Sequence, residues 1–146
     1  MRVPTAAAAI ALSWAAANTA RSYQPAVNYQ LNCMGCHLAD GSGQAGRVPS
    51  IRRSLVLFSA SPEGRNYIVR VPGVAQSPLS DADTAALLNW MAKNLSDLQL
   101  PPGFTDYSAV EIHGLRNRPL VKVSAIRERL WRTAAGKPRV PGLKQD

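Results

Sequence analysis

The chain contains very little cysteine and histidine, with two residues of each among 146. A structural zinc site usually needs four nitrogen or sulfur ligands, and outside residues 33–37 the sequence offers only His113 and carboxylates. No βαβ pattern surrounds Cys33, which argues against a redox pair of the thioredoxin type. A disulfide between Cys33 and Cys36 would close a loop too short to add much stability. A different use of the two thiols is therefore needed.

The sequence also lacks a long hydrophobic run. Its most apolar stretch, about residues 3–17, is alanine-rich and short for a membrane span. It follows Met1 and Arg2, and small residues continue to Ala20. A positive start, an apolar middle and a small-residue exit are typical of a secretory signal peptide. We therefore expect residues 1–20 to be a signal peptide that is removed on export, with an uncleaved anchor as the alternative.

The two cysteines lie in the run Cys33-Met34-Gly35-Cys36-His37. The spacing C-x-x-C-H is the attachment signature of a c-type haem. Each thiol can add across one vinyl group of a single porphyrin, and the imidazole of His37 then lies at an axial position of the iron. We predict one covalent haem c, with Cys33 and Cys36 as its anchors and His37 as the proximal ligand. Such attachment takes place outside an energy-transducing membrane, so we expect a periplasmic protein.

Acidic residues are few: nine Asp and Glu stand against 17 Lys and Arg, which gives a formal net charge of +8. Basic chains often bind nucleic acid, but an exported haem protein seldom meets it. We expect instead a redox protein partner with an acidic face, or a membrane complex at an anionic surface. A merely solvated basic surface is the alternative. No small-molecule substrate is required.

The run NCMGCHLADGSGQAGRVPSI resembles the haem-binding segment of class I, or mitochondrial-type, cytochromes c. In that family a proline about a dozen residues after the histidine offers its carbonyl to the histidine Nδ1 proton. The resemblance implies this role for Pro49, twelve positions after His37. Such a bond orients a ligating histidine and makes it more electron-rich. The glycines between the two residues need backbone freedom and a close approach, which we attribute to the porphyrin edge.

Capping residues and apolar spacing predict several helices. The clearest begins after Ser80 and has an apolar stripe of residues at three- and four-residue spacing. It resembles the C-terminal helix of class I cytochromes, with Trp90 and Met91 packing on the first helix. Asp81, Asn89 and Lys93 are expected on its other side. The other predictions are a helix over 26–32, a short buried helix within 50–60, a helix from Ser61 to about Val71 ended by Pro72-Gly73, a loop over 74–79, and helices over 108–115 and 124–133.

The last predicted helix begins at Ser124 and carries three arginines. Ile126, Leu130 and Trp131 form its apolar side, and Arg127, Arg129 and Arg132 are expected to line the exposed side. The chain from Gly136 onward is basic and contains two prolines, so a disordered tail is expected.

The sequence departs from class I cytochromes at the sixth iron ligand. That family has a methionine in the loop before its last helix, but here the corresponding loop over 71–80 reads VPGVAQSPLS and contains none. Met34 lies inside the attachment motif and points away from the iron. Met91, His113 or an open site remain as alternatives. Gln76 is a polar side chain in this loop that could hold a bound ligand.

These observations predict an all-α protein with a small class I cytochrome c fold around one haem. We expect the cytochrome domain over residues 21–98 and a basic C-terminal extension over 99–146. The function we expect is electron transfer between a dehydrogenase or membrane complex and an acceptor, by an electron carrier that is not an enzyme. Two alternatives stay open: a ligand-binding haem module that senses gas or acts as a weak peroxidase, and a haem subunit of a larger oxidoreductase.

Overall fold

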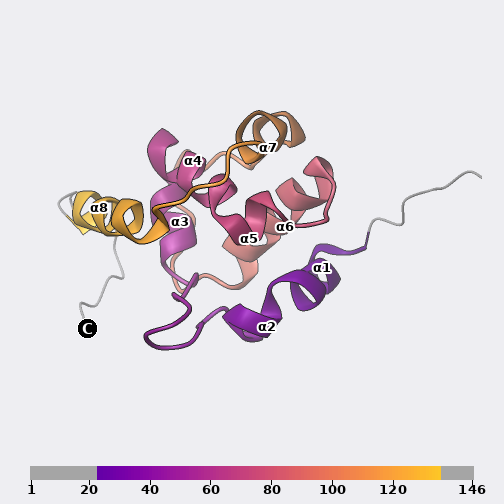
Figure 1. Ribbon diagram of the computed structural model, residues 1–146, viewed down its shortest axis with the longest axis horizontal. Coiled ribbons are helices and arrows are strands. Elements are labelled where there is room, and N and C mark those ends of the chain that lie inside the picture. The colour runs from indigo at the N-terminus through magenta and orange to yellow at the C-terminus, as the bar shows by residue number, and fades with distance from the viewer. Residues whose placement is uncertain (1–22, 136–146) are drawn as a thin grey trace, which may run out of the picture.

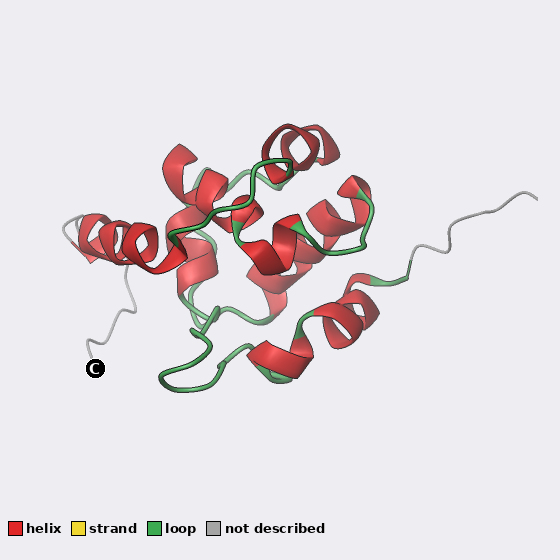
Figure 2. Ribbon diagram, viewed as in Figure 1, coloured by secondary structure: helices red, strands yellow, loops and turns green. Residues whose placement is uncertain are grey.

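The computed structural model describes residues 23–135, and the secondary structure within this range is helical, without strands (Figure 2). This agrees with the predicted all-α class. The helices are α1 (Pro25–Asn32), α2 (Met34–His37), α3 (Ser54–Ser59), α4 (Pro62–Arg70), α5 (Pro72–Ala75), α6 (Asp81–Asn94), α7 (Ala109–Arg116) and α8 (Val123–Ala135). In the view of Figure 1, α1 and α2 lie along the lower right edge, α7 lies at the top and α8 lies at the far left.

Two predicted segments fall outside this range, namely the signal peptide at 1–20 and the tail from Gly136. Within the described part of the chain, no helix combines the length and the apolar character that crossing a membrane requires.

Serine caps begin three of the helices at the predicted positions. The side-chain oxygens of Ser61, Ser80 and Ser108 accept hydrogen bonds from backbone N–H groups three residues later, at 3.1, 3.0 and 3.2 Å. Each cap satisfies one of the N–H groups that a helix start leaves without a partner. The predicted starts of α4, α6 and α7 are therefore confirmed.

The segment after α4 differs from the prediction. Pro72 ends α4 as expected, but it also begins α5, so residues 72–75 are helical and the loop starts at Gln76. Val71 has an extended backbone, with ψ at 138°, as residues before proline prefer. Proline then fits the first position of a new helix, where its missing N–H costs nothing.

Helix α6 packs on α1 through its apolar side. Leu87, Leu88 and Met91 are buried, and the ring of Trp90 lies 5.8 Å from the ring of Tyr29, centroid to centroid. The predicted contact between the Trp90-Met91 pair and the first helix is thus observed for Trp90.

The polar side of α6 is covered by the chain that follows residue 98. Asn89 exchanges two hydrogen bonds with the backbone of Tyr107, at 2.7 and 3.0 Å, and Lys93 forms an ion pair with Asp106 at 2.8 Å. Tyr107 and Ile112 belong to the same hydrophobic core as the apolar side of α6. Residues on both sides of the predicted boundary at 98 therefore share one core.

Helix α8 packs on α3 through Leu130, which is buried, and Trp131, whose ring meets that of Phe58 edge-on at 5.3 Å. Arg129 and Arg132 lie on the exposed side, as predicted. The prediction for Arg127 is wrong, because this residue is partly buried and its guanidinium lies 5.6 Å from the centre of the Trp131 ring. The guanidinium also lies 5.7 Å from the centre of the Phe58 ring, and at such distances a cation and an aromatic face attract each other.

Candidate functional site

Cys33, Cys36 and His37 lie on one helical turn, where α1 ends and α2 begins. The N–H of Cys33 closes α1 on the carbonyl of Tyr29 at 2.9 Å, and the carbonyl of Cys33 then accepts from Cys36 and His37 at 3.1 and 2.9 Å. Residues three positions apart on a helix share one face. The two thiols are not joined in a disulfide; Cys33 is partly buried and Cys36 is exposed. The turn therefore presents two free thiols on one side.

The chemistry of Cys33 differs from that of a redox cysteine. Burial, and secondarily the nearby Cys36, raise the pKa of Cys33 to about 11. Reactive cysteines of C-x-x-C oxidoreductases have lowered pKa values, because the thiolate is the nucleophile. Cys33 is therefore a protonated thiol at neutral pH, which disfavours disulfide exchange.

His37 is held as a neutral imidazole. Burial lowers its pKa, the carbonyl of Pro49 acts in the opposite direction, and the charge of Arg127 adds to the lowering. Its Nδ1 is buried and makes no hydrogen bond with any residue that the structure describes. The Pro49 carbonyl therefore acts to raise the pKa of His37, although it does not meet the geometry of a hydrogen bond with Nδ1. A neutral ring retains the nitrogen lone pair that a metal ion requires.

The residue after the site has an unusual backbone. Leu38 has a φ of 59°, the one positive φ outside glycine in residues 23–135. The hydroxyl of Tyr29 donates to the Leu38 carbonyl at 2.7 Å, and burial raises the pKa of Tyr29 to about 12, so the donor stays protonated. Such conformations persist when neighbouring contacts hold them. Tyr29 therefore fixes the exit of the chain from the site, a role that the sequence does not reveal.

The glycine-rich loop after His37 folds back on itself and brings Pro49 to the site. Gly43 has a φ of +74°, and a Cβ there would lie 2.4 Å from the carbonyl oxygen of Val48. The N–H of Gly43 also donates to the carbonyl of His37 at 3.1 Å. At Gly43 the close approach is thus to the backbone of residues 48 and 49 in the same loop, and the approach of the glycines to the porphyrin edge stays a prediction.

Met91 and His113, the two candidates for the sixth ligand, and Gln76, which could hold a bound ligand, lie in three different surroundings. Met91 is buried in the core, with 6% of its surface exposed. His113 lies on α7 with 75% of its side chain exposed, and its Nδ1 is 3.0 Å from a carboxylate oxygen of Asp81. Gln76 is exposed at the start of the loop. The structure thus brings Cys33, Cys36, His37 and Pro49 together, with Met91 in the core and both His113 and Gln76 exposed.

The loop over residues 76–80 is fastened by Arg116 from α7. Its guanidinium donates to the carbonyls of Ala75, Ser77 and Leu79 at 3.3, 2.7 and 2.8 Å, and to the carboxylate of Asp81 at 3.0 Å. The sequence carries no local signal for these contacts, because the partners lie 35–41 residues away.

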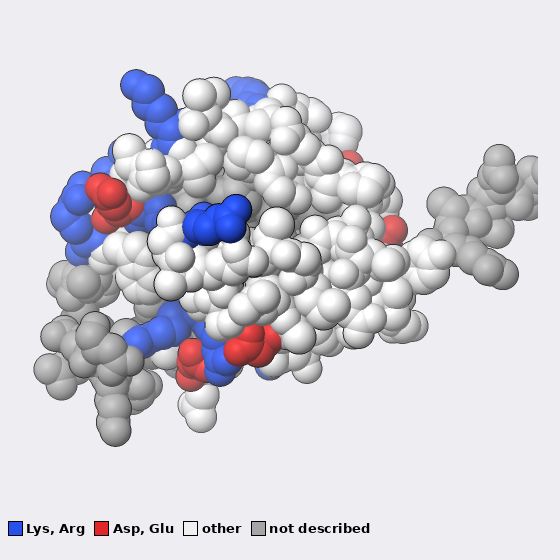
Figure 3. All heavy atoms as spheres, turned by 60° about the horizontal axis from the view of Figure 1, so that its bottom comes forward, with Lys and Arg blue, Asp and Glu red and all other residues white. Residues whose placement is uncertain are grey.

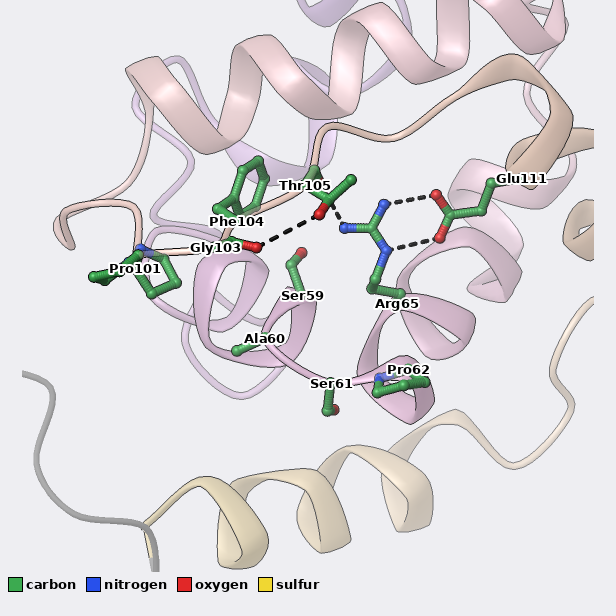
Figure 4. Close-up of a pocket in the computed structure, with 11 residues that line it drawn as sticks. Ser59, Ala60, Ser61, Pro62, Arg65, Pro101, Gly103, Phe104, Thr105 and Glu111 are labelled. Carbon is green, nitrogen blue, oxygen red and sulfur yellow. Dashed lines mark hydrogen bonds and ion pairs between the residues drawn. The ribbon is translucent and has the colours of Figure 1, made fainter.

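A cavity of about 430 Å³ lies elsewhere, between the start of α4 and the loop before α7 (Figure 4). The guanidinium of Arg65 lies at its wall, paired with the carboxylate of Glu111 at 2.6 Å and donating to the carbonyl of Thr105 at 2.7 Å. None of the residues that line the cavity belongs to the turn with the two thiols.

The chain is similar to known proteins over about two thirds of its length. Cytochrome c-552 of Thermus thermophilus is 29% identical over 115 residues, which cover 66% of this chain and 88% of the relative. A second cytochrome c-552, from a designated strain of the same species, is also 29% identical over 115 residues, with 66% of this chain and 78% of the relative covered. No protein-family model matches the chain, and no solved structure matches it. This distant similarity points to a c-type cytochrome with a covalent haem.

Proposed function

We propose that this protein is a single-haem c-type cytochrome that carries one electron in the periplasm, between a dehydrogenase or membrane complex and an acceptor. One observation carries the proposal: two free thiols and a neutral, partly buried imidazole lie on a single helical turn. The similarity to cytochrome c-552 supports it. A bound haem supplies the one-electron couple of its iron, and the protein acts as a carrier rather than an enzyme.

We assign each residue of the site a separate role in holding the haem. Cys33 and Cys36 form the two thioether bonds, and His37 provides the proximal nitrogen ligand. Pro49 lies beside the His37 ring, with its carbonyl already acting on the imidazole. We expect this carbonyl to accept a hydrogen bond from the Nδ1–H group of His37 when haem is bound, which would fix the orientation of the ring.

The intact mass of the exported protein tests haem attachment. Made in a host with the maturation machinery, the wild-type chain should exceed the mass of the bare polypeptide by one haem. The double variant Cys33→Ala and Cys36→Ala should lack this mass, and Met34→Ala, an exposed position in the same turn, should retain it. A wild-type protein without the added mass contradicts the proposal. Recovery of that mass in the periplasmic fraction tests the localisation.

The sixth ligand remains a choice between Met91, His113 and an open position. Spectra of Met91→Leu and His113→Ala variants decide it, with Met34→Leu as the control. Because His113 is exposed and engaged by Asp81, we expect its replacement to leave the spectrum unchanged. Loss of a low-spin spectrum in Met91→Leu alone would assign Met91.

A ligand-binding haem module is the second candidate, favoured by one observation: residues 71–80 contain no methionine, histidine, lysine or cysteine. Carbon monoxide separates the two functions. A ferrous spectrum that carbon monoxide leaves unaltered supports electron transfer, whereas a high-spin spectrum that it shifts supports ligand binding. A peroxidase needs an acid or base near the iron, and Gln76, the candidate in this loop, cannot serve as either.

The partner we propose is a redox protein with an acidic face, or a membrane complex. Figure 3 shows the blue Lys and Arg side chains gathered at the α8 end of the face in view. Residues 23–38, which include the attachment turn, contain no Lys, Arg, Asp or Glu. Exposed charges are screened beyond about 10 Å at ~0.1 M salt, so electron transfer should slow as salt rises. A rate indifferent to salt contradicts steering by these arginines.

Size-exclusion chromatography of a periplasmic extract tests whether the protein is a subunit of a larger oxidoreductase. Elution as a free small protein would exclude a tightly held subunit.

A further inference from the structure

Arg127 reaches from α8 to the loop that carries Pro49. Its Nη2 lies 3.4 Å from the carbonyl oxygen of Ser50, and its guanidinium carbon lies 5.7 Å from the centre of the Phe58 ring. The residue is partly buried. A guanidinium from the C-terminal part of the chain therefore lies beside the haem-binding segment, 77 residues away in sequence from the carbonyl that it contacts.

The charge environment of Arg127 differs from that of its neighbours on α8. The guanidinium of Arg129 pairs with Glu63, and Arg132 lies 4.0 Å from Glu128. Among the residues that the structure describes, no carboxylate forms an ion pair with Arg127. A partly buried charge without a counter-ion is costly, and a guanidinium in such a position fits a planar carboxylate through two parallel hydrogen bonds.

The contact with the Ser50 carbonyl, next to Pro49, places the guanidinium beside the site, and the pKa values of two neighbouring groups agree with this. The charge of Arg127 lowers the pKa of His37, and it opposes the effect of burial, which raises the pKa of Tyr67. Neither a neutral imidazole nor a protonated phenol can neutralise a guanidinium. The haem that the proposed function places on this turn carries two propionates, and these are its anionic groups at neutral pH.

We propose that Arg127 forms an ion pair with a propionate of the haem held at Cys33 and Cys36. This inference rests on the proposed function. It lies outside the part of the chain that resembles class I cytochromes, because α8 follows residue 98. The pair gives α8 a role at the cofactor and keeps a positive charge near the iron, which favours the reduced state.

The midpoint potential of the haem-loaded, full-length protein tests the ion pair. In Arg127→Gln we expect the equilibrium between ferrous and ferric haem to shift about tenfold toward ferric, which is ~59 mV for one electron. Arg127→Lys should restore most of the shift, because it keeps the charge. Arg129→Gln, two positions away on the exposed side of the same helix, is the matched control and should leave the potential unchanged.

The pH profile of the potential separates an ion pair from a charge that acts at a distance. Loss of a paired guanidinium raises the pKa of the propionate, so in Arg127→Gln the potential should begin to fall with rising pH in a range where the wild type is flat. An unchanged potential, or a lowered potential with an unchanged profile, overturns the inference.

A structure of the haem-loaded wild type gives the answer even if Arg127→Gln does not mature. A distance above 4.0 Å between the guanidinium and both propionates overturns the ion pair. Failure of the proposed function has a different signature, because the wild-type protein would then lack the mass of a haem.

Discussion

Replacing Arg116 by alanine should destabilise the protein and loosen the loop over residues 76–80. The guanidinium donates to three backbone carbonyls of residues 75–79 and to the carboxylate of Asp81. Only 14% of the Arg116 side chain and 29% of that of Asp81 are exposed. Alanine leaves these four acceptors with water as their only substitute, at positions where water has limited access.

The expected loss of unfolding free energy in Arg116→Ala lies between two limits. An exposed ion pair contributes about 0–1 kcal/mol, and removal of one partner from a fully buried pair costs about 3–5 kcal/mol. Hydrogen bonds to a charged group contribute about 1.5–3 kcal/mol each, but several on one guanidinium do not add, and the exposed fraction of Asp81 lets water return. We therefore expect Arg116→Ala to lower the free energy of unfolding by about 2–4 kcal/mol.

Urea unfolding of the haem-loaded protein, followed by circular dichroism at 222 nm, measures this loss. The control is Arg132→Ala, whose side chain is 73% exposed and 4.0 Å from Glu128; its expected loss is below about 0.5 kcal/mol. Arg116→Lys keeps the charge but not the fork of donors, so its loss should be intermediate. A loss for Arg116→Ala within error of that for Arg132→Ala would refute the reasoning.

Two further predictions concern the attachment loop and acid. In urea unfolding, Gly43→Ala should lower the free energy of unfolding clearly more than Gly46→Ala does. Both glycines have a positive φ, but of the two only Gly43 has a backbone oxygen 2.4 Å from where a Cβ would lie. Equal losses of unfolding free energy would contradict this reasoning. The pKa of Asp81 is lowered by its hydrogen bonds, chiefly that from Arg116 and then that from His113. Its stabilisation is therefore complete above the unfolded pKa of about 4 and is lost as pH falls through the lower folded value. Asp81→Asn should flatten this part of the profile of unfolding free energy between about pH 2 and 6, and parallel profiles for variant and wild type would contradict the assignment.

The features that the sequence predicts correctly depend on residues close together in the chain. The caps at Ser61, Ser80 and Ser108 each act over three residues, and each forms as predicted. The C-x-x-C-H turn is equally local, since its geometry follows from one helical turn. Pro72 correctly predicts the end of a helix, but a proline at a helix end fits the start of the next helix equally well, so the sequence does not reveal α5.

The features that the sequence could not predict are long-range choices of side-chain partners. Helical periodicity places Arg127 on the polar side of α8, but the rings of Phe58 and Trp131 attract its guanidinium inward. Glu111 is spaced for a reciprocal capping box with Ser108, yet its carboxylate pairs with Arg65 on α4 instead. A cation and its partner 46 residues away leave no spacing pattern. Only the packed chain reveals which charges meet.

These pairings change what the net charge of +8 means for function. Several arginines pair with carboxylates of the same protein, which reduces their contribution to its outer field: Arg65 with Glu111 and Arg116 with Asp81, which are partly buried, and Arg52 with both Asp40 and Asp97 at the surface. Arg129 and Arg132 of α8 are more exposed than these, but they too lie beside carboxylates, so an acidic partner would compete with Glu63 and Glu128 for them. Electrostatic steering acts over a longer range than close contact. An acidic partner of the kind proposed above would accordingly be drawn toward α8 by long-range attraction, which added salt screens.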